Sequence, residues 1–120
     1  FDRLYELGKS LEKIIELYKP NILSIEKLFF TTNQKTAMRV SEIRGMILYL
    51  ATKNNLQIFE YTPLQVKCTI AGHGRADKTQ VTMMVNKLIM IKKEIKEDDE
   101  YDAIALALTC LACEPALSTV

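Results

Sequence analysis

The stretch LSIEKLFF, residues 23–30, sets apolar residues around one acid and one base. Pro20 and Asn21 precede it, and a polar run at residues 31–33 follows it. These boundaries and the apolar content predict a short buried strand that carries Glu26. Burying a carboxylate is costly unless a cation meets it. Glu26 is therefore either a solvated residue at a strand end or part of a charged site.

Helical and strand patterns alternate along the rest of the chain. Helices are expected at residues 2–19, 36–53, 63–70, around 81–88 and 99–113, and a second strand at 57–61. Thr62 and Gln65 have the spacing of a capping box at the start of the helix at 63–70. The order strand, helix, strand, helix predicts an α/β fold with parallel strand pairing and right-handed crossovers. The apolar residues of 36–53 are numerous enough to predict burial on more than one side. The length of 120 residues predicts one domain over 1–120.

Composition narrows the functional classes. Lys and Arg number 16 against 15 Asp and Glu, so any nucleic-acid site must be a local patch. No apolar run is long enough to span a bilayer and no signal segment opens the chain, which predicts a cytoplasmic protein without membrane contact. Cys110 and Cys113 have zinc-like spacing, but no second pair accompanies them, so buried thiols are expected.

Two charged segments are candidates for function. Residues 71–78, AGHGRADK, are glycine-rich and basic, but Asp77 stands where a phosphate-binding loop needs glycine, and a predicted helix comes before the segment. The second segment, 94–102, contains six acids, which a helix N-terminus alone would explain. Asp99 and Asp102 are three residues apart, on one helix face. If they met Glu26, the three carboxylates would favour magnesium or manganese, because these ions prefer oxygen ligands.

Several short segments agree in order and spacing with one known family. They are SIEKLFF at 24–30, SEIRG at 41–45, FEYTP at 59–63, VK at 66–67, GHGRADK at 72–78 and DEYDA at 99–103. Through them the sequence resembles the RuvC-type Holliday-junction resolvases, which are endonucleases of the ribonuclease H-like fold. The resemblance implies a mixed sheet flanked by helices and metal-dependent hydrolysis of phosphodiesters in four-way junction DNA.

The same resemblance implies roles for individual residues. It implies that three catalytic carboxylates bind Mg²⁺, for which Mn²⁺ may substitute: Glu26, Asp99 and Asp102. It implies DNA contacts by four residues: Phe29, Lys67, Arg75 and Lys78. Phe29 would stack on bases, the basic residues would contact phosphates, and Lys78 would also stabilise developing charge. By the same resemblance, residues 36–53 would line a homodimer interface, and a branch-migration helicase complex would be a partner.

The sequence departs from the family at one place. Family members open with a strand hairpin that carries a further catalytic Asp, and no such segment precedes residues 2–19 here. We therefore expect an N-terminally truncated resolvase domain with impaired cleavage. Two alternatives stay open at this point: a non-catalytic ribonuclease H-like domain that binds nucleic acid, and a structural α/β domain whose acids only cap a helix.

Overall fold

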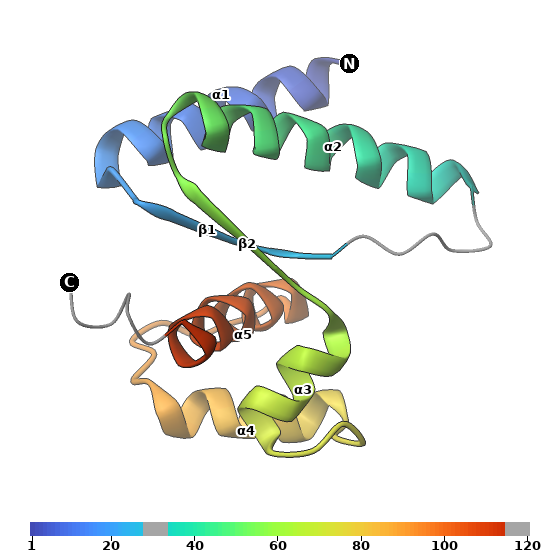
Figure 1. Cartoon of the computed structure of the whole chain (residues 1–120), viewed down its shortest axis with the longest axis vertical. Helices are drawn as coiled ribbons and strands as arrows, with labels where there is room; N and C mark the ends of the chain where they lie inside the picture. The colour runs from blue at the N-terminus through green and yellow to red at the C-terminus, as the bar shows by residue number, and fades with distance from the viewer. Residues whose placement is uncertain (28–33, 115–120) are drawn as a thin grey trace. The chain divides into compact units, whose positions relative to one another are not determined.

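The computed structural model describes residues 1–27 and 34–114 of the chain (Figure 1). In chain order the elements are α1 (Asp2–Tyr18), β1 (Ile22–Glu26), α2 (Gln34–Lys53), β2 (Gln57–Tyr61), α3 (Pro63–Ala71), α4 (Lys78–Leu88) and α5 (Asp98–Cys113). The expected helices and the strand at 57–61 are thus confirmed, with small shifts at their ends. The strand expected over 23–30 is present as β1, but it is half-buried rather than buried, and Glu26 at its end is exposed. Residues 28–30 of that expected strand lie outside the described residues. The expectation for Phe29 lies outside the described residues.

The strands β1 and β2 pair with each other in parallel. The amide of Gln57 donates to the carbonyl oxygen of Asn21 at 2.8 Å, and the amide of Lys27 donates to the carbonyl oxygen of Tyr61 at 2.8 Å. Residue numbers increase in the same direction along both strands from the first bond to the second, which defines a parallel register. The strand-helix-strand-helix order and the parallel pairing were predicted correctly.

The described chain divides into two compact units, which we consider separately. The first contains residues 1–23 and the described part of 28–59, and the second contains residues 24–27 and the described part of 60–120. Glu26 therefore belongs with the three C-terminal helices. A single domain over 1–120 stays a prediction.

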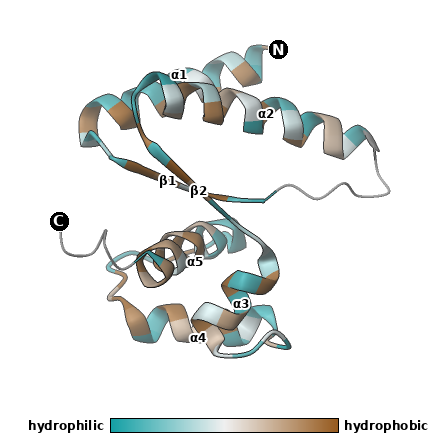
Figure 2. Ribbon diagram, viewed as in Figure 1, coloured by the Kyte–Doolittle hydropathy of each residue, from teal (hydrophilic) through white to brown (hydrophobic). Residues whose placement is uncertain are grey.

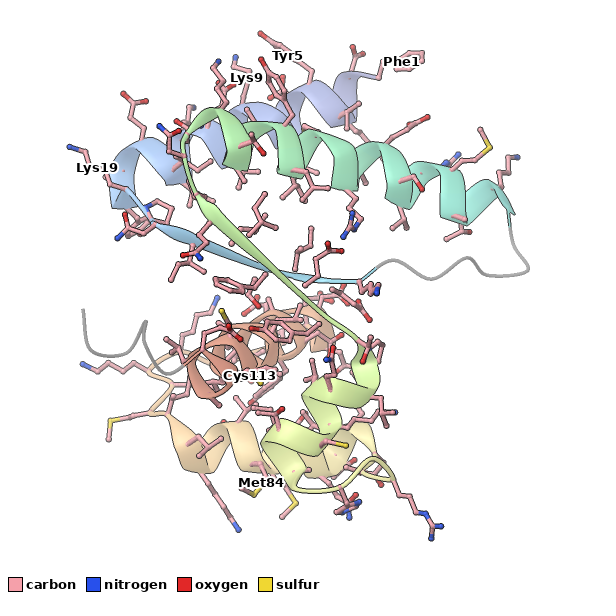
Figure 3. The ribbon with its side chains drawn as sticks, in the orientation of Figure 1. Phe1, Tyr5, Lys9, Lys19, Met84 and Cys113 are labelled. Atoms are coloured by element: carbon pink, nitrogen blue, oxygen red, sulfur yellow. The ribbon has the colours of Figure 1, made fainter. Side chains whose placement is uncertain are left out.

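In the first unit, α1 packs against α2. Gly8 of α1 permits a close approach, because a Cβ atom built there would lie 2.9 Å from the sulfur of Met46. Lys9 lies over the ring of Tyr5 on the exposed side of α1, with 5.2 Å between the ammonium and the ring centroid (Figure 3). This side of α1 is the solvated face expected of an amphipathic helix.

Burial of 36–53 on more than one side, against the sheet and against a second subunit, stays a prediction for the first half of α2. Leu50 and Ala51 at its end are buried, but Met38 and Val40 are exposed. Apolar residues around a whole helix need neighbours on every side. The described neighbours cover the C-terminal end of α2 and leave its N-terminal half open.

In the second unit, α3, α4 and α5 pack around a core of Ile70, Val85 and Ala105. Each of these helices contributes one of the three residues. Along α5 the character changes from hydrophilic at its start to hydrophobic further on (Figure 2). The acidic start of α5 is therefore at the surface while its later turns complete the core.

Two capping boxes fix where α3 and α4 begin. The amide of Gln65 donates to Thr62 Oγ1 at 3.1 Å and the amide of Thr62 donates to Gln65 Oε1 at 2.7 Å, as the sequence predicted. Asp77 and Gln80 form the same pair of bonds at 2.8 and 3.0 Å. Asp77 is thus an N-cap, which explains an acid within the basic segment 71–78.

The cysteine prediction was half right. Cys110 is buried, but Cys113 is exposed in the last turn of α5, where its sulfur lies 3.7 Å from Thr69 Oγ1. Cys110 is the last buried residue of α5, and Cys113, labelled in Figure 3, is open to solvent. In the described part of the chain, no helix combines the length and apolar character needed to cross a membrane.

Tyr61, at the end of β2, is held in the second unit by α5. Its side chain is 5% exposed, and its hydroxyl donates to Glu114 Oε2 at 3.2 Å. Burial is the largest cause that raises the pKa of Tyr61 above its ordinary value, and contacts with Cys110 and Glu114 add to it. The folded state therefore favours the neutral phenol.

This raised pKa predicts a loss of stability at alkaline pH. Above about pH 10 the unfolded chain loses the phenol proton while the folded chain keeps it, so the free energy of unfolding falls as pH rises. In Tyr61→Phe this fall should be smaller, as measured by urea denaturation between pH 8 and 11. The control Tyr49→Phe changes an exposed tyrosine and should keep the wild-type slope. Equal slopes for wild type and Tyr61→Phe would contradict the assignment.

Candidate functional site

A cavity of about 320 Å³ in the second unit gathers four of the expected site residues. They come from four different elements: Glu26 from β1, Lys67 from α3, Lys78 from α4 and Asp102 from α5. The rest of the lining is largely apolar: Pro63, Val66, Val81, Thr82, Tyr101, Ala105 and Leu106. Residues 76 positions apart in the sequence, Glu26 and Asp102, thus line one cavity.

The position of Glu26 follows from strand geometry and one hydrogen bond. Ser24 and Glu26 are two residues apart in β1, so their side chains leave the same face of the strand. Ser24 Oγ donates to the carbonyl oxygen of Leu106 in α5 at 2.7 Å. This bond holds that face of β1 against α5, and Leu106 is itself part of the cavity wall. Glu26 is the exposed last residue of β1, so the solvated alternative for its carboxylate is compatible with a role in the cavity.

Lys78 connects α4 to the acidic start of α5. Its ammonium lies 3.4 Å from Asp102 Oδ2 and 3.9 Å from Asp98 Oδ2. Asp98 and Asp102 are four residues apart, one turn of α5, which allows one ammonium to reach both carboxylates. All three side chains are more than half exposed. Such pairs stabilise a fold by only about 0–1 kcal/mol each, so these contacts set local charge balance more than they add stability.

Tyr101 is a site residue that the sequence reasoning missed. It lines the cavity beside Asp102, and its hydroxyl lies 3.2 and 3.3 Å from the amide nitrogen and oxygen of Asn86 in α4. This contact ties the first turn of α5 to α4. Thr82, one turn after Lys78 on α4, places a hydroxyl in the same lining and was also missed. A polar residue one turn from a candidate lysine is a signal that could have flagged Thr82.

Two expected site residues lie outside this cavity. Asp99 and Arg75 are exposed and do not line the cavity. Phe29 is outside the described residues. Lys78 meets Asp98 and Asp102. Sequence spacing predicts instead that Asp99 and Asp102 lie beside Glu26, and of these two only Asp102 lines the cavity with Glu26.

The carboxylates were tested for their fit to a metal ion. Glu26 and Asp102 offer oxygen atoms, the ligands that magnesium and manganese prefer. Over residues 1–27 and 34–114, however, no three or more His, Cys, Asp or Glu side chains lie close enough together to hold a metal. The described residues therefore provide the right type of ligand but too few of them, and an ammonium already lies beside Asp102.

The hydrogen bond from Ser24 predicts how much the contact between β1 and α5 contributes to stability. Ser24→Ala removes it and should lower the free energy of unfolding by about 1 kcal/mol, because the Leu106 carbonyl loses its side-chain donor. The matched control Ser10→Ala changes an exposed serine in α1 and should alter stability by less than about 0.5 kcal/mol. Urea denaturation measures both. Equal effects of the two substitutions would show that Ser24 does not hold β1 to α5.

Comparison with known proteins gives a consistent family. The family model described as crossover junction endodeoxyribonuclease RuvC matches residues 1–110. The RuvC of Caldicellulosiruptor saccharolyticus is 50% identical over 106 residues, which cover 88% of this chain and 64% of that protein. The RuvC of Caldanaerobacter subterraneus subsp. tengcongensis is 46% identical, with the same coverage. The chain thus spans a little under two thirds of the length of these relatives.

Two solved structures support the fold. The structure described as T. thermophilus RuvC in complex with Holliday junction substrate has a TM-score of 0.86 at 28% identity and covers 93% of this chain and 68% of its own. The Thermus thermophilus RuvC structure has a TM-score of 0.79 at 29% identity, with 90% and 65% covered. They confirm the predicted α/β, ribonuclease H-like architecture. With the family model matched over nearly the whole sequence, the chain belongs to the RuvC family of crossover junction endodeoxyribonucleases.

Proposed function

We propose that this chain forms part of an endonuclease that resolves Holliday junctions in DNA recombination and repair. One observation carries the proposal: two acids and two lysines from four elements line one cavity in a chain 50% identical to a RuvC. The relatives are named crossover junction endodeoxyribonucleases, and one structural neighbour is described with a Holliday junction substrate. Because the chain spans 64% of such a relative, full cleavage activity is proposed for the whole protein and impaired cleavage for this chain.

The charges of the cavity suit a phosphodiester. Lys67 and Lys78 supply ammonium groups for phosphate oxygens. Glu26 and Asp102 supply carboxylate oxygens on the same cavity. We propose Mg²⁺ as the cofactor, with Mn²⁺ as a substitute and Asp99 as a further ligand. Held by these carboxylates, such an ion would activate water and stabilise the leaving oxygen in phosphodiester hydrolysis.

Further parts of the proposal concern partners and location. Arg75 is proposed to contact a phosphate, which its exposure beside α3 and α4 permits, and Phe29 to stack on bases. The exposed apolar residues of α2, among them Met38, Val40 and Ile43, support a homodimer through that helix. A branch-migration helicase complex as partner and a cytoplasmic location follow from the proposed role in DNA.

A second candidate function is a non-catalytic domain that binds junction DNA. One observation favours it: the described residues hold no group of three carboxylates close enough for a metal, although two lysines line the cavity. Junction binding by the unaltered chain, without any strand cleavage in magnesium, would favour this candidate over the nuclease.

The nuclease proposal predicts a separation of binding from cleavage. Glu26→Gln should lower the rate of strand cleavage on the order of 100-fold, because a charged group at the reacting phosphate is lost. Junction affinity should stay near the wild-type value. Both are read from a labelled four-way junction in parallel binding and cleavage gels. The control Glu12→Gln changes an exposed acid of α1 and should retain both properties. Wild-type cleavage by Glu26→Gln would contradict the role of Glu26.

The salt dependence of junction binding distinguishes a phosphate contact by Lys67 from a purely structural role of this lysine. Each phosphate contact releases counterions, so Lys67→Ala should reduce the slope of log affinity against log salt by about 0.9. Fluorescence anisotropy with a labelled junction between 50 and 250 mM salt measures this slope. The control Lys53→Ala removes an exposed lysine at the end of α2 and should leave the slope unchanged. An unaltered slope in Lys67→Ala would exclude this phosphate contact.

A further inference from the structure

Three polar side chains lie one turn apart along one face of α4: Lys78, Thr82 and Asn86. At one end of this row, the Lys78 ammonium lies 3.4 Å from Asp102 Oδ2 in α5. At the other end, the amide nitrogen of Asn86 lies 3.2 Å from the hydroxyl oxygen of Tyr101 in α5. Thr82, between them, therefore also faces α5, and it lines the cavity of the second unit.

The hydroxyl of Thr82 is not used by the fold. A threonine within a helix can donate to the carbonyl oxygen four residues earlier, as Thr109 does to Ala105 at 2.7 Å. Within residues 1–27 and 34–114, Thr82 forms neither this bond nor any other side-chain hydrogen bond. Thr82 is half-buried, so a group that enters the cavity is the partner its hydroxyl lacks.

We propose that Thr82 donates a hydrogen bond to a phosphodiester oxygen of junction DNA, as the neutral member of a donor set with Lys67 and Lys78. All three residues line one cavity, and Lys78 precedes Thr82 by one turn on the same face. A hydroxyl donates along a defined direction, so it orients a phosphate that the two ammonium groups attract. The inference rests on the proposed function in taking junction DNA as the ligand, and it holds whether the chain cuts the junction or only binds it.

A neutral donor has one advantage over the lysines of this cavity. The ammonium of Lys78 is shared with Asp102 and Asp98, and Glu26 adds another carboxylate to the lining. These acids compete with a phosphate for positive charge. Thr82 forms no hydrogen bond to any of them in the described chain, so its hydroxyl stays open to the ligand.

The test measures the affinity of the full chain for a labelled four-way junction by fluorescence anisotropy at several salt concentrations. Thr82→Val replaces the hydroxyl with a methyl group of similar size and should weaken binding about tenfold, as expected for loss of a hydrogen bond to a charged group. The slope of log affinity against log salt should stay at the wild-type value, because a hydroxyl releases no counterions. Thr82→Ser keeps the donor and should bind within about twofold of the wild type.

Two further variants provide the controls. Thr79→Val changes an exposed threonine of α4 that does not line the cavity, so its affinity should stay within about twofold of the wild type. Lys67→Ala removes a charge from the cavity and should reduce the salt slope, which reports junction binding at this cavity independently of Thr82.

The possible results separate clearly. Wild-type affinity in Thr82→Val overturns the inference, and so does an equal loss in Thr82→Ser, which would indicate a packing role. A reduced salt slope in Thr82→Val also overturns it, because a displaced lysine would then explain the loss. If circular dichroism shows that Thr82→Val is unfolded, Thr82→Ala provides the same comparison.

The inference and the proposed function can fail separately. Absence of junction binding by the wild type overturns both of them. A reduced salt slope in Lys67→Ala together with wild-type affinity in Thr82→Val overturns the inference alone. Tenfold weaker binding by Thr82→Val at an unchanged slope supports it even if the chain never cuts the junction.

Discussion

The hydrogen bond from Ser24 Oγ to the carbonyl oxygen of Leu106 spans 82 positions of sequence at 2.7 Å. It holds one face of β1 against α5, and that face also carries Glu26. Leu106 belongs to the wall of the cavity that Glu26 lines. The neutral hydrogen bond of Ser24 therefore holds the carboxylate of Glu26 on the same cavity as the acidic start of α5. Charge alone would separate these acids, since like charges repel.

The electrostatics of the cavity are balanced at short range. Two carboxylates and two ammonium groups share it, and one of each type forms a direct pair. Equal numbers of positive and negative groups give the cavity a small net charge. Its ion pair can rearrange at low cost because the paired side chains are solvated. In a cavity that binds a polyanion, such a rearrangement lets the positive groups face the ligand while every helix and strand stays folded.

Regular elements were predictable from the sequence because their signals are local. The spacing of apolar residues predicts all the helices. The spacing of Thr62 and Gln65 predicts the capping box that starts α3. Asp77 and Gln80 have the same spacing, so this second capping box can also be read from the sequence. The resemblance to a family supplied Glu26, Lys67, Lys78 and Asp102, all of which line one cavity.

Other features depended on tertiary contacts that no local pattern contains. The pairing of Lys78 with Asp98 joins α4 to α5 and is a tertiary contact. The contact of Tyr101 with Asn86 joins two helices whose sequence spacing gives no sign of it. Cys113 is exposed because the buried part of α5 ends at Cys110. The role of Asp99 as a metal ligand stays a prediction.

The most direct measurement of the central claim, that junction DNA binds at the cavity of the second unit, is an amide chemical-shift map of this chain. Isotope-labelled chain would be titrated with a short four-way junction at moderate salt. The account predicts that shifts and line broadening centre on Lys67, Lys78 and Asp102 and leave Glu12 and Lys53 of the first unit little affected. Perturbations centred on the first unit, with the cavity residues unchanged, would contradict it.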